Sequence, residues 1–103
     1  MSLPRATPAE AEFTDRRSMP RREVSIPAKV GFRSGPPVHC IVRNISPMGA
    51  MLEFIDEQNV PPTFRIVIDS EMFAADCEVR HVKGRNVGVL FTSNRLEAMA
   101  RFS

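Results

Sequence analysis

Residues 75–91, ADCEVRHVKGRNVGVLF, carry the clearest structural pattern in the chain. Apolar side chains recur at every second position on both sides of residues 83–86, KGRN, namely Ala75, Cys77 and Val79 before them and Val87, Val89 and Phe91 after them. Alternation with period 2 is typical of a strand with one buried and one exposed face, and a short glycine-containing segment between two such runs is typical of a turn. The stretch therefore predicts two antiparallel strands joined by a tight turn.

Four earlier segments show the same pattern. They predict strands over residues 26–32, 38–45, 50–54 and 64–69, separated by the pair Pro36 and Pro37 and by the polar loop 55–62. After the last strand the period changes to that of a helix. Asn94 with Glu97 three residues later resembles a capping box, and the stripe predicted for the short helix consists of Leu96, Met99 and Ala100.

Six short strands followed by one helix indicate an all-β fold. Because exposed edge strands invite aggregation, we expect a small closed six-stranded antiparallel β-barrel with a short C-terminal α-helix over one opening. The chain has 103 residues, 43% of them apolar, which suits one domain. Residues 1–15, rich in Pro, Ala, Thr and Glu, are expected to form a flexible tail, and residues 16–103 the barrel domain.

Long apolar segments are missing, so no membrane insertion is expected. The first twenty residues contain Pro4, Pro8 and two glutamates without an apolar block, which is unlike a secretory signal. We therefore expect a cytoplasmic protein whose only two cysteines are buried, inert thiols rather than a disulfide framework.

Catalytic and metal sites are not indicated. His39 and Cys40 are adjacent on a strand and point to opposite faces, whereas Cys77 and His81 share a face about 13 Å apart at ~3.3 Å per residue. No glycine-rich phosphate loop or nucleophile elbow is present. The sequence thus predicts no enzyme, no metal site and no catalytic residue.

Two features remain. Four arginines, Arg16, Arg17, Arg21 and Arg22, gather just before the first strand, and a turn with the sequence NISPMG connects the second and third strands at residues 44–49. Arginine offers a flat fork of donors for planar acceptors and phosphate. In the turn, Asn and Ser side chains can bond to the local backbone, and a glycine at residue 49 can adopt positive φ.

Taken together, these two features resemble the PilZ family. Its signature is an R-x-x-x-R pair before the first barrel strand and a D/N-x-S-x-x-G turn between the second and third strands, here Arg17–Arg21 and Asn44–Gly49. Residues 24–30, VSIPAKV, and 87–91, VGVLF, add to the likeness, which covers residues 16–103.

The resemblance implies a bacterial domain that binds the second messenger cyclic di-GMP without catalysis and with no other cofactor. By this likeness, Arg17 and Arg21 bind guanine and phosphate, Arg16 and Arg22 are weaker candidates for supporting contacts, and the turn supplies Asn44, Ser46 and Gly49. Many family members carry Asp at the position of Asn44, so the charge-assisted acceptor is lost here. A domain of this kind is expected to pass the signal to an unidentified downstream protein.

Two alternatives stay open. The first is a divergent PilZ adaptor that binds only protein. The second is a small barrel for single-stranded nucleic acid, which is less favoured because the formal net charge is only +2 and the chain has no Tyr or Trp for base stacking. A nucleic-acid polymer of any kind is not expected as a partner, because a net charge of +2 is too small to bind many phosphates.

Overall fold

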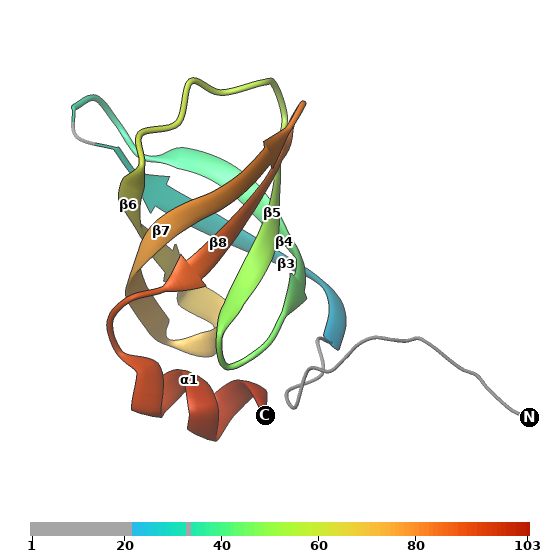
Figure 1. Cartoon of the computed structure of the whole chain (residues 1–103), viewed down its shortest axis with the longest axis vertical. Coiled ribbons are helices and arrows are strands. Elements are labelled where there is room, and N and C mark those ends of the chain that lie inside the picture. The colour runs from blue at the N-terminus through green and yellow to red at the C-terminus, as the bar shows by residue number, and fades with distance from the viewer. Residues whose placement is uncertain (1–21, 33) are drawn as a thin grey trace, which may run out of the picture.

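The computed structural model describes residues 22–32 and 34–103, so the predicted tail and Arg16, Arg17 and Arg21 lie outside the described residues. The described chain forms six strands, one 3-10 turn and one α-helix (Figure 1). In chain order these elements are β3 (Arg22–Gly31), β4 (Val38–Ile45), β5 (Gly49–Phe54), β6 (Thr63–Ile68), η1 (Asp69–Glu71), β7 (Phe73–Lys83), β8 (Asn86–Phe91) and α1 (Arg95–Phe102).

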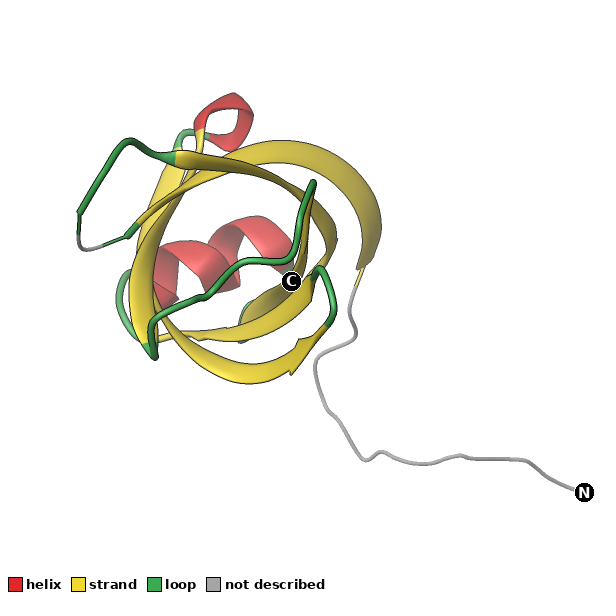
Figure 2. Ribbon diagram, turned by 90° about the horizontal axis from the view of Figure 1, so that it is seen from above, coloured by secondary structure: helices red, strands yellow, loops and turns green. Residues whose placement is uncertain are grey.

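The strands close into a barrel in the order β3-β4-β5-β8-β7-β6, and every neighbouring pair is antiparallel. Figure 2 looks into the barrel, with α1 lying across the far opening. The prediction of a six-stranded antiparallel barrel with a short C-terminal helix is therefore confirmed. The eight residues of α1 are too few to cross a bilayer, and none of the described helices could do so.

The interior is filled by the alternating apolar residues that defined the strands. Each strand contributes side chains to one core, among them Val30, Val42, Leu52, Ile66, Cys77 and Val87, all fully buried. Such alternation places every second side chain inside a closed sheet and leaves its neighbour outside.

The helix closes the barrel through Ala98 and Phe102, which are buried one helical turn apart. The ring of Phe102 packs edge-on against Phe73 with centroids 5.0 Å apart, and Phe73 in turn lies 5.4 Å from Phe91. The predicted apolar stripe is wrong. Leu96 is 87% exposed, and Met99 and Ala100 also face outward.

The capping box predicted at Asn94 is wrong as well. Asn94 adopts a left-handed conformation with φ 56° and makes no side-chain cap. Its Nδ2 instead donates a hydrogen bond to the Ala74 carbonyl at 2.9 Å, while Glu97 pairs with Arg101 along the helix. Because the chain enters the helix from this tether to β7, a different face from the one predicted meets the core.

Strand pairing extends two strands beyond their apolar patterns. β3 begins at Arg22 rather than at Ile26, since the polar residues Arg22 and Glu23 pair with Ile45 and Asn44 of β4. β7 continues to Lys83 past an irregularity between Val79 and His81. Backbone hydrogen bonds, which need no apolar side chain, hold these extensions.

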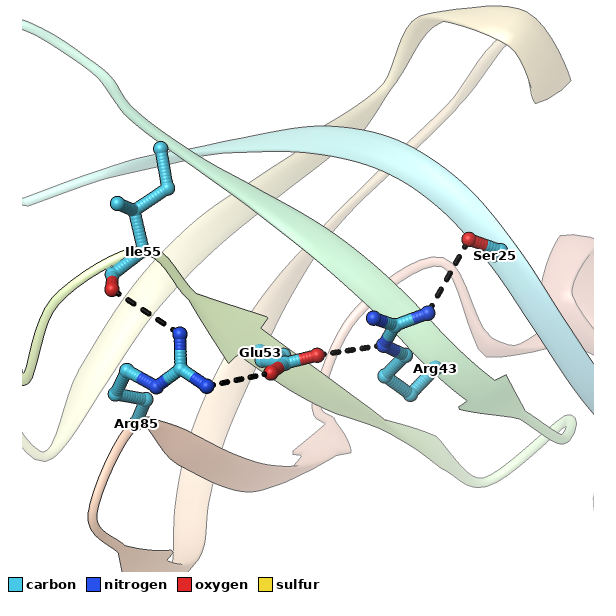
Figure 3. A network of polar contacts seen from close by, with 5 residues as sticks. All are labelled: Ser25, Arg43, Glu53, Ile55 and Arg85. Carbon is cyan, nitrogen blue, oxygen red and sulfur yellow. Dashed lines mark hydrogen bonds and ion pairs between the residues drawn. The ribbon is translucent and has the colours of Figure 1, made fainter.

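A polar network ties neighbouring strands together on the outer surface (Figure 3). The carboxylate of Glu53 on β5 accepts from Arg43 at 2.6 Å and from Arg85 at 3.1 Å. Arg43 also donates to the Ser25 hydroxyl, and Arg85 to the Ile55 carbonyl. The hydrogen bond and the charge of Arg43 lower the pKa of Glu53. Both arginines are thereby committed to structural contacts.

If Phe102 holds α1 on the barrel, Phe102→Ala should lower the free energy of unfolding by about 3 kcal/mol, through the lost apolar contact and the cavity left behind. Leu96→Ala is the matched control on the same helix, and its exposed side chain predicts a change within about 0.5 kcal/mol. Urea unfolding followed by circular dichroism measures both. Equal effects of the two substitutions would contradict this packing.

Candidate functional site

The turn between β4 and β5 borders a hollow of about 440 Å³. In Figure 1 this turn lies at the end of the barrel that α1 covers. The hollow is lined by the turn and by three neighbouring strands: Asn44 and Ser46, residues 48–51, Arg80 and His81 of β7, and residues 88–90 of β8. A volume of this size is within the range of small-molecule sites. The structure thus brings the three predicted turn residues, Asn44, Ser46 and Gly49, to one recess.

Ser46 holds the turn together. Its backbone N–H donates to the Gly49 carbonyl at 2.9 Å, and its Oγ accepts from the Met48 N–H at 3.2 Å. The Met48 carbonyl accepts from the Phe91 N–H at 2.8 Å, which fastens the turn to β8. Ser46 is only 6% exposed, yet its hydroxyl keeps one hydrogen to donate. The residue therefore combines a structural bond with a donor beside the hollow.

Residue 49 must be a glycine because of close packing and not because of its backbone conformation. Its φ is not positive; among the described glycines only Gly35 and Gly84 have positive φ. A Cβ on Gly49 would instead lie 2.0 Å from the Val89 carbonyl oxygen of the neighbouring strand β8. No side chain fits there, so the expectation of positive φ is wrong, and close backbone approach explains the glycine.

Asn44 carries the one buried side-chain polar atom that lacks a hydrogen-bond partner among the described residues, its Oδ1. Asn44 pairs with Glu23 of β3 and Met51 of β5, just after an irregularity at Arg43. This acceptor belongs to a residue that lines the hollow, so a donor group of a molecule bound there could pair with it.

Strand β3 begins next to this turn. Arg22 pairs with Ile45, the residue immediately before Ser46, so Arg21 is one residue from a strand pair that borders the site. The Arg22 side chain is not part of the lining of the hollow and donates from Nη2 to the Arg101 carbonyl at the end of α1, at 2.9 Å. Arg16, Arg17 and Arg21 lie outside the described residues.

Arg80, His81 and Gly88 line the hollow but were not among the predicted site residues. The irregularity in β7 between Val79 and His81 interrupts the alternation there, and the sequence carries no signal of it. Gly88 did offer a hint, since a glycine within a strand often marks the close approach of a ligand or of another backbone.

A cluster of metal-ligating side chains does not form in the described part of the chain. No three His, Cys, Asp or Glu side chains come together there. Cys40 and Cys77 are free and buried, as expected, and burial raises the pKa of each thiol to about 12, with the charge of Asp76 adding to the effect at Cys77. Protonated thiols of this kind are poor nucleophiles.

The structure is thus a small closed barrel with a hollow beside one strand turn. The family model of the PilZ domain matches residues 15–102, and the chain therefore belongs to the PilZ domain family. Domains of this family are generally cyclic di-GMP-binding or adaptor domains. No match was found among curated proteins.

If β8 presses against Gly49, Gly49→Ala should lower the free energy of unfolding by about 2 kcal/mol or more, because the backbone must move to admit a methyl group. Gly31→Ala is the control, since a Cβ on Gly31 meets nothing within 4 Å. Urea denaturation of the two variants distinguishes them. A Gly49→Ala protein as stable as Gly31→Ala would refute the close approach.

Thiol titration tests the closed core. At pH 8.5 both cysteines should resist Ellman's reagent in the native protein and react fully in urea, since their pKa of about 12 lies above the ordinary 9.0. Because unfolded thiols lose protons from pH 9 and folded ones only near 12, the unfolding free energy should fall as pH rises through this window. Fast labelling of the native protein would contradict their burial.

Proposed function

We propose that the protein binds cyclic di-GMP without catalysis, between the segment that carries Arg17 and Arg21 and the turn with Asn44, Ser46 and Gly49, and relays the signal to a partner protein. The observation that carries this proposal is the unpartnered Oδ1 of Asn44 beside a recess of about 440 Å³. Membership of the PilZ family supports the choice of ligand.

The chemistry of the turn suits a guanine. A guanine base presents the N1–H and N2–H donors, and Asn44 Oδ1 is an acceptor without a donor. The remaining hydrogen of the Ser46 hydroxyl can be donated to a phosphate oxygen or to guanine O6. Binding of the ligand would then give this acceptor a donor.

Chain length brings the arginine pair within reach of this turn. Successive Cα atoms are 3.8 Å apart, and Arg21 immediately precedes Arg22, which pairs with Ile45. Arg17 precedes Arg21 by four residues, so the two Cα atoms are at most about 14 Å apart in a fully extended chain. Guanidinium groups match both the O6 and N7 edge of guanine and the phosphates, so one residue type answers both parts of the ligand.

Arg22 provides a contact through which ligand binding can alter the position of α1. Its bond to the Arg101 carbonyl joins the start of β3 to the end of α1. If Arg17 and Arg21 are drawn over the ligand, the backbone next to Arg22 changes its course and this bond is strained or released. We infer that the surface around α1 changes with occupancy, which a downstream protein can detect.

Isothermal titration calorimetry with cyclic di-GMP tests the proposal. We expect micromolar binding, on the order of −7 to −9 kcal/mol, and a loss of ~1.5–3 kcal/mol for Arg17→Ala or Arg21→Ala. Arg65→Ala, which removes an arginine paired with Asp76 on the outer surface, should bind as the wild type does. Absence of heat at about 100 µM ligand, where −5 to −6 kcal/mol is still detectable, would favour the protein-only adaptor; equal affinity for a short single-stranded oligonucleotide would favour a nucleic-acid barrel.

A second experiment isolates Asn44. Asn44→Leu should raise thermal stability, because a buried unsatisfied acceptor is removed, and should weaken ligand binding about tenfold or more through loss of the guanine contact. Asn44→Asp should tighten binding about fivefold, since an ionised acceptor forms stronger hydrogen bonds. If Asn44→Leu instead destabilises the protein and leaves affinity unchanged, the residue serves only the turn.

A further inference from the structure

The hollow has a second wall formed by β7 and β8, where Arg80 and His81 lie near Gly88. We propose that this wall is the second half of the ligand site: Arg80 binds a phosphate of the nucleotide, and the side-chain-free surface at Gly88 receives the ligand between Met51 and His81. This inference rests on the proposed function and extends it to residues that neither sequence motif contains.

The strand register gives Arg80 a special position. Val79 pairs with Val89 and His81 with Gly88, so Arg80 is the extra residue of a β-bulge and has no partner on β8. A bulge redirects side chains out of the regular alternation, and bulges are common beside functional sites. Arg80 is the one arginine among the described residues that line the hollow.

The guanidinium of Arg80 is only loosely held. Its Nη1 lies 3.6 Å from Glu78 Oε2, with side chains 61% and 46% exposed. By comparison, Arg43 lies 2.6 Å from Glu53, and Arg65 lies 3.1 Å from Asp76. Exposed pairs contribute little stability, so a phosphate can take over the donors of Arg80 at small cost.

Gly88 leaves part of the wall of the hollow without a side chain. A Cβ at this position would lie 3.5 Å from Met51 Cε and 3.5 Å from His81 Cβ, which is ordinary contact distance. The fold therefore tolerates a side chain at residue 88, and its φ is not in the left-handed region. Glycine weakens the interior of a strand, so its presence at residue 88 is not explained by the stability of the fold. Access for a ligand explains it.

Calorimetry with cyclic di-GMP on matched variants tests this half of the site. Arg80→Ala should weaken binding about tenfold, the usual effect of losing a charge-assisted hydrogen bond. Arg65→Ala is the control, because it removes the same charge from a similarly exposed ion pair away from the hollow. Glu78→Gln should strengthen binding about threefold by releasing Arg80 from its carboxylate, whereas Asp76→Asn should leave affinity unchanged.

Gly88→Val provides a readout independent of charge. Valine favours strands and its Cβ would meet its neighbours at ordinary contact distance, so the protein should stay folded while binding falls at least about tenfold, because the side chain occupies the ligand's space. If the wild type binds but Arg80→Ala matches Arg65→Ala and Gly88→Val keeps full affinity, this inference fails and the proposed function stands. If the wild type does not bind at all, the proposed function fails and takes the inference with it.

Discussion

The close approach of β8 to Gly49 is the constraint on which the site depends. Because the Val89 carbonyl occupies the space of a side chain at residue 49, β5 and β8 can pair up to the very end of the turn. The Phe91 N–H then fastens the Met48 carbonyl, and the hydroxyl of Ser46 bonds within the same turn. A turn fixed in this way holds Asn44 and Ser46 at the edge of a recess whose far side belongs to β7.

The second determinant is where the first described strand begins. Pairing of Arg22 with Ile45 places the first described residue of β3 beside the turn. Of the arginines on the described barrel, Arg43 and Arg85 both pair with the carboxylate of Glu53. Arg80 is held more loosely than these.

The barrel could be predicted from the sequence because, in a closed sheet, every second side chain of a strand faces the core, so apolar residues alternate along the chain. The strand at residues 38–45 was predicted with its observed bounds. The polar start of β3 and the far end of β7 were missed, since backbone pairing holds them without apolar side chains. The helix was predicted, but its buried face was not, because the tether from Asn94 to Ala74 joins residues twenty positions apart.

For the site, local motifs found the turn but not the wall across from it. Asn44, Ser46 and Gly49 lie within six consecutive residues, whereas Arg80 enters the hollow through a bulge that no local pattern encodes. Pairing of β5 with β8, and of β8 with β7, is what brings Arg80 near the turn. Residues that are far apart in the sequence and become neighbours through strand pairing are identified only from the structure.

The most direct measurement is a titration of the ¹⁵N-labelled protein with cyclic di-GMP, followed by ¹H–¹⁵N correlation NMR. The account predicts that the largest shift changes fall on the amides of Ser46, Gly49, Arg80 and Gly88, with smaller changes near Arg101, and that strands remote from the hollow such as β6 stay unmoved. Spectra that do not change, or changes centred on the outer Glu53 network instead, would contradict it.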